Sequence, residues 1–361
     1  MDRDSASCQV KLDLIKMPMT EAILHGGSLA AWRANNSFYI AIATYILLAV
    51  TAAEHWGIPI DVQLYNQGFW VFGCAVAVVL FSIISIRVML SRPERIFSEI
   101  KSKLAKYQLG ERIIRGVPVL IVFPIFFSVF TSMKDGINRI VPFYLDGKLV
   151  EVDRFINFGT DAWRVFHPVL GLGIATFTIN FFYNLWFVFM FVVLFCVTFS
   201  VGNDRLRSRY LVAFVLTWAI LGNVAATIFA SVGPAFVMPF FGDGTFAPLM
   251  DYLKATNNVY PVWALYAQNM LLANAASDGP RMGSGISAFP SMHVAIAMLN
   301  AVFLWRFGGI LRWIGVAFLI MTQLGAVHLA WHYAIDGYAS MLATPIIWML
   351  AGWLSTSSKR G

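Results

Sequence analysis

The fold depends on the segment that begins Gly283-Ser-Gly-Ile-Ser-Ala-Phe-Pro-Ser-Met-His293 and ends His328-Leu-Ala-Trp-His-Tyr-Ala-Ile-Asp336. Between these ends lie two apolar runs, residues 294–304 and 310–327, joined by the turn Trp-Arg-Phe-Gly-Gly. Such runs predict a helical hairpin across a membrane, and a hairpin returns its end to the face on which it began. His293 and His332 are therefore expected on one membrane face, in one site with a serine and an aspartate.

The composition is that of a membrane protein. Of the 361 residues, 59% are hydrophobic and 12% are charged, and this charged fraction is about half that of a soluble domain. Several apolar runs reach ~20 residues, enough to cross a bilayer as helices. The runs are continuous rather than alternating, which argues against a membrane barrel, and open sheets are excluded in lipid. The expected fold class is all-α, a polytopic integral membrane protein with about eight transmembrane helices.

Charge and cysteine content exclude other classes. The net charge of +7 fits basic cytoplasmic loops, so no nucleic-acid partner is expected. The three cysteines, Cys8, Cys74 and Cys196, have no spacing typical of a disulfide framework or a zinc site. We expect no cofactor.

Basic residues indicate one topology. They cluster at residues 87–115 and 203–209, at Arg306 and Arg312, and at the C-terminal Lys359-Arg360. Because basic loops stay in the cytoplasm, both termini are expected there. The expected spans are residues 37–53, 68–90, 116–132, 171–201, 210–232, 290–306, 310–331 and 334–354. Two long segments, 133–170 and 233–288, are then non-cytoplasmic and carry short surface helices.

Three regions follow from this pattern. Residues 1–36 are expected to form a polar to amphipathic cytoplasmic N-terminus, residues 37–132 N-terminal transmembrane helices with the basic loop, and residues 133–361 a membrane domain that contains both ends of the predicted hairpin. Within the first region, residues 17–32 are either a helix on the membrane surface or a partly ordered tail. The expected location is the inner or plasma membrane of a cell, or its equivalent.

The first candidate motif is Phe289-Pro-Ser-Met-His293. Pro290 suits the first helical turn, where its missing N–H costs little. Ser291 and His293 then lie at a helix N-terminus, where free N–H groups favour an anion. The preceding Gly283 and Gly285 allow the backbone to approach a ligand closely. Alone, the motif indicates either a phosphate site or a proline-capped helix start with incidental polar residues.

The second candidate motif is His332-Tyr-Ala-Ile-Asp336. The four-residue spacing predicts that both side chains share one helical face. Asp336 can then hold one imidazole nitrogen and raise the nucleophilicity of the other. His328 adds a third residue at this spacing, so a metal-binding face is an alternative. We expect no metal, because Ser291 and His293 fit phosphate better than a ligand set.

Over residues 283–337 these motifs resemble the type-2 phosphatidic acid phosphatase superfamily, whose pattern is Pro-Ser-Gly-His followed by Ser-Arg-x5-His-x3-Asp. Phe-Pro-Ser-x-His and His-Tyr-x-x-Asp look most like its inositol phosphorylceramide synthase branch. The resemblance implies that His332 attacks phosphorus to form a phosphohistidine and that Asp336 orients it. It also implies that His293 protonates the leaving oxygen and then acts as base toward the acceptor. Ser291 and nearby backbone N–H groups would hold phosphate oxygens.

The chain departs from the family pattern in its basic residues. The arginine before the second histidine is Ala326 here, and Ser85 stands where Arg92-Pro93 would need a lysine. Other basic residues must then meet the phosphate charge, and the candidates are Lys134, Arg139, Arg164 and Arg281, each of which fits an ordinary surface charge or structural pair better. Gly285 and His328 are further candidates for binding phosphate through hydrogen bonds. His328 is equally compatible with helix packing. Helix–helix contact is favoured over substrate contact for Asn180, Tyr183, Asn184 and Trp186.

The expected activity is a membrane lipid phosphotransferase that moves a phosphorylated headgroup, such as inositol phosphate, from a phospholipid donor to a lipid alcohol acceptor in sphingolipid metabolism. Because the sequence lacks the arginine and lysine of the family pattern, a phosphotransferase is favoured over a lipid phosphate or diphosphate phosphatase. A proton-coupled transporter is disfavoured because the ionisable residues lie at helix ends rather than in mid-span. The expected partners are these lipids and the bilayer, and the sequence predicts no oligomeric state.

Overall fold

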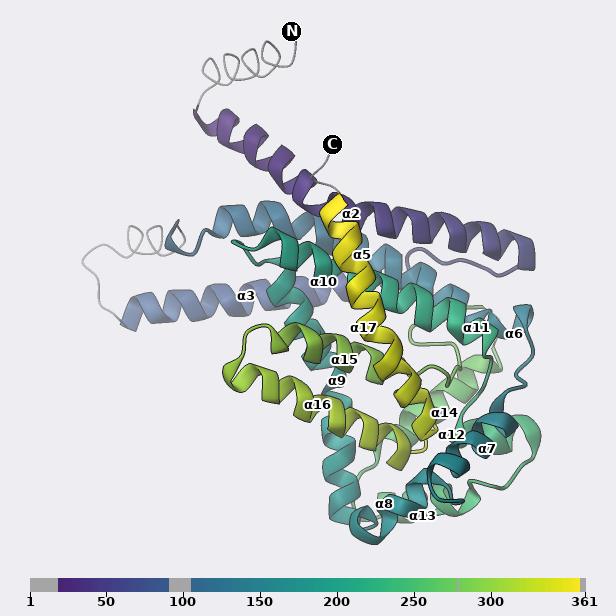
Figure 1. The fold of residues 1–361 in the computed structure, drawn as a ribbon. Helices are drawn as coiled ribbons and strands as arrows, with labels where there is room; N and C mark the ends of the chain where they lie inside the picture. Colours follow the sequence, from purple (N-terminus) through teal and green to yellow (C-terminus); the bar gives the residue numbers. More distant parts are fainter. Residues whose placement is uncertain (1–18, 91–104, 278, 358–361) are drawn as a thin grey trace.

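The computed structural model describes residues 19–90, 105–277 and 279–357, which form helices and no strand (Figure 1). In the described residues, six helices are long and apolar enough to cross a membrane. They are Asn35–Trp56 of α2 (Met19–Trp56), α5 (Leu109–Asp135), α9 (Gly173–Thr198), Asp204–Ile228, α16 (Gly309–His328) and Ala334–Ser355 of α17 (Ala334–Ser357). A further apolar helix, α15 (Met292–Trp305), is too short to be counted among them. The predicted all-α, polytopic membrane fold is confirmed, with six helices long enough to cross a membrane in the described residues where about eight were expected.

Each of the predicted spans coincides with a helix. α3 (Asn66–Leu90) covers the span predicted at residues 68–90. α15 covers the one predicted at 290–306, but it begins at Met292 with Ser291 as its N-cap, so Pro290 lies before the helix rather than in its first turn. α2 is helical from Met19 onward, so the predicted N-terminal helix and the first span form one element. Residues 91–104 of the basic segment lie outside the described residues.

An aromatic core joins α5, α9 and α10 (Asp204–Thr217). Phe123 of α5 and Phe214 of α10 are fully buried, with ring centroids 5.8 Å apart in an edge-to-face contact. α10 continues through a π-helical turn, η1 (Trp218–Ala225), into α11 (Ala226–Ile228). At the other end of α10, the buried Arg207 donates from Nη2 to the carbonyl oxygens of Thr198 (2.8 Å) and Arg115 (3.0 Å). Arg207 therefore ties the end of α9 to α5.

The helical hairpin predicted around the two motifs is confirmed. α15 and α16 lie side by side (Figure 1). Gly315 of α16 allows the close approach, because a Cβ at this position would lie 2.9 Å from the Cα of Ala301. α17 packs on α15 as well, and Ser340 Oγ donates to the carbonyl oxygen of Ser291 at 2.9 Å. The start of α15 and the start of α17 therefore meet.

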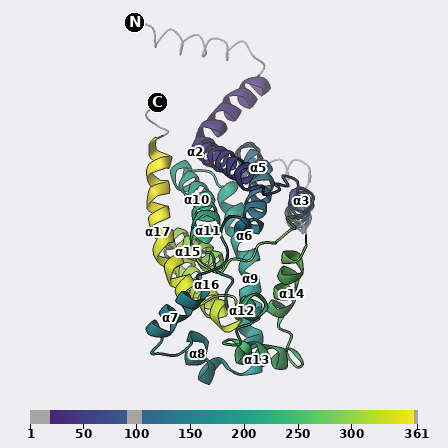
Figure 2. The ribbon, with the colours of Figure 1, turned by 90° about the vertical axis from the view of Figure 1, so that its right-hand side faces the viewer.

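The two long segments fold into short helices, as predicted. The first contains α6 (Ile137–Ile140), α7 (Asp146–Ile156) and α8 (Ala162–Leu170), and the second contains α12 (Pro234–Phe241), α13 (Ala247–Asn257) and α14 (Trp263–Ala275). In both views α7, α8, α12 and α13 gather at one end of the molecule (Figures 1 and 2). Their apolar side chains form a second core with residues around the His332 motif: Leu149, Trp163, Phe236, Leu253, Leu329 and Tyr333. The segments thus form a cap over that end of the helices.

Candidate active site

The two motifs meet where α15 and α17 begin. Ser291 is the N-cap of α15, and its Oγ accepts from the backbone N–H of Val294 at 3.4 Å. The Ser291 N–H donates to the carbonyl oxygen of Asp336 at 3.2 Å. Ser291 is fully buried and does not line the neighbouring cavity. In this structure it connects the motifs through its backbone.

His332 and Asp336 form a contact, but not as two residues of one helix. α16 ends at His328 and α17 begins at Ala334, so His332 lies in the intervening loop. His332 Nδ1 lies 3.3 Å from Asp336 Oδ2, which also accepts the backbone N–H of Tyr333 at 3.0 Å. Ala326 holds the loop, since its carbonyl oxygen accepts the N–H groups of Trp331 and His332, both at 3.0 Å. The Nδ1 contact leaves His332 Nε2 for another partner.

His293 lies beside His332, with ring centroids 6.1 Å apart. Its ring is stacked on Tyr183 at 4.9 Å and lies 4.4 Å from Trp186. Trp186 Nε1 also donates to the His293 carbonyl oxygen at 2.8 Å. The sequence favoured helix contact for these two residues, and they do join α9 to α15. They also line the cavity that is described in the next paragraph. In the sequence, only their three-residue spacing, which places both on one helical face, could have indicated that they share a site.

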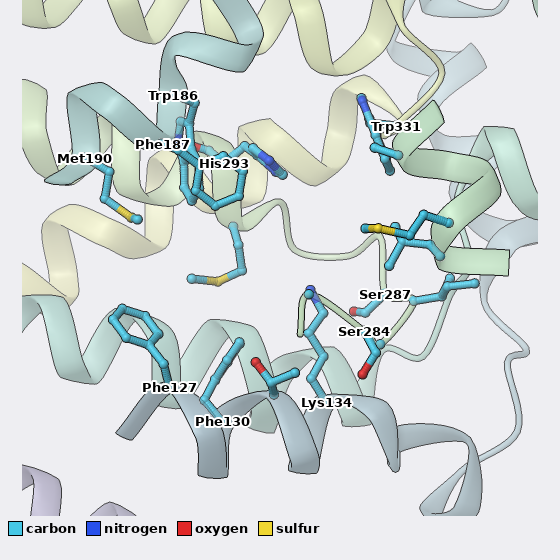
Figure 3. A pocket seen from close by; sticks show the side chains of 18 of the residues that line it. Phe127, Phe130, Lys134, Trp186, Phe187, Met190, Ser284, Ser287, His293 and Trp331 are labelled. Atoms are coloured by element: carbon cyan, nitrogen blue, oxygen red, sulfur yellow. Dashed lines mark hydrogen bonds between the residues drawn. The ribbon is translucent and has the colours of Figure 1, made fainter. Parts of the chain in front are cut away.

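A cavity of about 330 Å³ lies against both histidines. Its lining includes polar groups from Lys134, Ser284, Ser287, His293 and His332, and also the apolar side chains of Phe127, Phe187, Met190, Phe191 and Trp218. Figure 3 shows Lys134 extending from α5 into this space. Of the described residues that line the cavity, Lys134 is the one lysine or arginine. The cavity therefore combines a few polar groups, two histidines and a lysine among them, with a largely apolar wall, as is usual for ligand pockets.

A comparison with models of known protein families shows which family the chain belongs to. Residues 147–350, more than half of the chain, match the family model described as the PAP2 superfamily. The chain belongs to the PAP2 superfamily. The match extends from α7 to α17 and includes both motifs, and it supports lipid phosphate chemistry of the phosphatase or phosphotransferase type. No curated protein and no solved structure matches the chain.

Several residues expected in this PAP2 site lie elsewhere. His328 is fully buried, with Nε2 2.8 Å from Thr176 Oγ1 and its ring stacked on His167. Arg139 donates to the Gly57 carbonyl oxygen at 3.1 Å, and Arg164 pairs with Asp161 at 3.2 Å. None of these three predicted residues, nor Arg281, lines the cavity. The structure brings Lys134 and Gly285 to it instead.

The described residues contain no group of three or more histidine, cysteine, aspartate or glutamate side chains able to hold a metal ion. His328, His332 and Asp336 do not continue along one helix, because His332 lies in the loop between α16 and α17. The equal spacing of the three residues in sequence therefore does not produce a metal-binding face.

Gly285 adopts a conformation that favours glycine and touches the lysine segment. Its φ is +94°, and a Cβ would lie 2.8 Å from the backbone carbon and the Cγ of Lys134. Gly283 has a similar φ of +73° but has open space around its Cβ position. Both glycines line the cavity.

Gly285→Ala is therefore expected to lower the melting temperature in detergent more than Gly283→Ala. Strain at φ alone costs about 1–3 kcal/mol in either variant, and only Gly285→Ala must also displace Lys134. Turnover by Gly285→Ala should fall at least ~10-fold more than turnover by Gly283→Ala. Equal losses in the two variants would show that the contact with Lys134 has no effect.

Proposed function

We propose that this protein transfers a phosphorylated headgroup from a phospholipid to a lipid alcohol through a phosphohistidine at His332. The observation that carries the proposal is that His332, supported by Asp336, and His293 line one cavity that also has a lysine and many apolar side chains in its wall. A headgroup phosphate and the first part of a lipid chain match these polar and apolar groups.

The proposed reaction has two steps. In the first, His332 Nε2 attacks phosphorus, the bond from phosphorus to the diacylglycerol oxygen breaks, and His293 gives that oxygen its proton. In the second, the acceptor hydroxyl loses its proton to His293 and attacks phosphorus, and the P–N bond breaks. His332 returns to its starting form. Asp336 stabilises the charge that develops on the His332 ring during attack.

We propose that Lys134 neutralises the negative charge of the substrate phosphate. Phosphoryl transfer depends on positioning and on stabilising charge at the phosphate oxygens. Lys134 supplies a cation, and the backbone around Gly285 and the Ser284 and Ser287 side chains supply further polar groups in the cavity wall. Lys134 would then take the role of the arginine that the family pattern has at the position of Ala326.

We also propose that the cavity opens on the non-cytoplasmic side and that both termini are cytoplasmic. α17 starts at the site and ends at Ser357, and the basic residues Lys359 and Arg360 follow it in the sequence. Ser37 Oγ of α2 donates to the Leu354 carbonyl oxygen at 3.1 Å, so the first span begins on the side where α17 ends. Arg306 and Arg312 flank the α15–α16 turn, at the opposite end of α15 from His293. This distribution fits the bias of basic residues toward the cytoplasm.

A headgroup-transfer assay on purified protein tests the proposed activity. The donors are labelled phosphatidylinositol and labelled phosphatidate, each with and without ceramide or diacylglycerol, and His332→Ala is the control. The expected result is labelled headgroup on the acceptor, dependent on His332. Free phosphate from phosphatidate without an acceptor would instead identify a phosphatase. Proton flux through reconstituted vesicles without any phosphorylated product would favour the transporter.

A further inference from the structure

α7 carries two buried carboxylates that face the His332 loop. Asp146 and Asp153 are seven residues, about two turns, apart and so share one face of α7. Each is 5% exposed. Asp146 Oδ1 accepts the Tyr333 hydroxyl at 2.8 Å, and Asp153 Oδ1 accepts the Ile335 N–H at 3.0 Å. The two carboxylates therefore hold the chain on the C-terminal side of His332, up to the residue before Asp336.

Asp146 also binds a third segment, residues 231–235. Its Oδ2 accepts the Val232 N–H and its Oδ1 the Gly233 N–H, both at 2.9 Å. Gly233 packs so tightly on the His332 loop that a Cβ there would lie 2.8 Å from the Trp331 carbonyl oxygen. A carboxylate is an acceptor able to serve several donors at once, which suits it to this junction.

The same segment binds the chain before His293. Ser231 accepts two N–H groups from that chain: that of Ala288 at its carbonyl oxygen (3.0 Å) and that of Phe289 at its Oγ (3.1 Å). The Ala235 N–H donates to the Ala330 carbonyl oxygen at 2.9 Å. Residues 231–235 thus form a bridge between the two histidine motifs, and Asp146 is bonded both to this bridge and to Tyr333.

We propose that Asp146 and Asp153 are positioning residues that set the separation of His293 and His332. This inference rests on the proposed roles of the two histidines. Neither carboxylate lines the cavity, so each acts through the loops that it holds. Asp146 is the stronger determinant, because it contacts the bridge and the His332 loop together.

Asp146→Asn tests the proposal. The amide nitrogen cannot accept a hydrogen bond, so at least one of the three buried donors loses its partner. We expect kcat to fall about 100-fold with KM changed less than about threefold, as for a misplacement of catalytic groups. Glu151→Gln is the matched control, because it makes the same change on an exposed side chain of α7.

Tyr333→Phe provides a milder variant if Asp146→Asn fails to fold. It removes one hydrogen bond to a charged group and should lower kcat about tenfold. The Asp146→Asn/Tyr333→Phe double variant should lose less than the product of the two single effects, because both remove the same contact. Fully multiplicative losses would overturn the coupling.

Hydrogen–deuterium exchange provides a readout that requires no lipid substrate. In Asp146→Asn we expect faster exchange in residues 286–293 and 329–336, with exchange in the rest of the protein close to that of Glu151→Gln. Unchanged exchange in both loops, or faster exchange throughout the protein, would overturn the positioning role. If the wild-type protein turned over none of the lipids tested, the proposed function would fail while exchange still decided this inference.

Discussion

His332→Ala is expected to abolish turnover, with a loss of about 10⁴-fold or more, because it removes the proposed nucleophile. The measurement is headgroup release and transfer by purified protein in detergent micelles. Wild-type protein quenched during turnover should carry acid-labile phosphate label, and His332→Ala should carry none. His55→Ala, which changes an exposed histidine at the end of α2, should retain both activity and label.

His293→Ala separates the two histidine roles. A general acid contributes typically 10²–10⁴-fold, so a loss of this size is expected with an alkyl phosphate ester, whose alkoxide leaving group needs a proton. An aryl phosphate, whose phenolate leaves without protonation, should restore much of the first step in His293→Ala but not in His332→Ala. The proposed assignment would be reversed if the aryl substrate rescued His332→Ala instead. Label retained in His332→Ala would sink the phosphohistidine mechanism.

Lys134→Met is expected to produce the second large effect, a loss of about 10²–10³-fold in kcat/KM. The reason is that Lys134 is the one lysine or arginine among the described residues lining the cavity, and removing one charge-stabilising group from a reaction centre costs this much. Methionine keeps the length and apolar stem of lysine, so the packing between α5 and the Gly285 loop should persist. Steady-state kinetics over a range of donor concentrations measure the change.

Arg139→Met is the contrast for this prediction. Arg139 follows Lys134 by five residues and was an equal candidate from the sequence, but it donates to the Gly57 carbonyl oxygen outside the cavity. Its loss should change kcat/KM less than about threefold, as for most surface substitutions. A larger effect from Arg139→Met than from Lys134→Met would refute the assignment of the phosphate charge to Lys134.

The elements that the sequence predicts best are those with local signals. Each expected span coincides with a helix, because a run of apolar residues long enough to span a bilayer has few alternatives to a helix in lipid. The hairpin between residues 293 and 332 follows from two such runs and one short turn. The short helices of both long segments were also expected, from recurring apolar residues in the first segment and an amphipathic stretch in the second.

The sequence predicted which residue types form the candidate site better than it predicted their geometry. His332 and Asp336 do contact each other, but Asp336 lies in the first turn of α17 and His332 in the loop before it. The spacing of four residues is compatible with both arrangements. Ser291, expected to face the ligand, is buried as the N-cap of α15.

Sequence alone thus determined the all-α membrane fold, the hairpin and the two histidine motifs. Only the tertiary structure shows that Lys134 lines the cavity and that Arg139, Arg164 and His328 do not. It also shows that Asp146 contacts the His332 loop and the segment bonded to the chain before His293. The physical reason is the range over which each interaction acts along the chain. Hydrophobic runs and charge bias act on each segment separately, whereas the direction of a side chain depends on which helices pack against it, and those contacts join residues far apart in the chain.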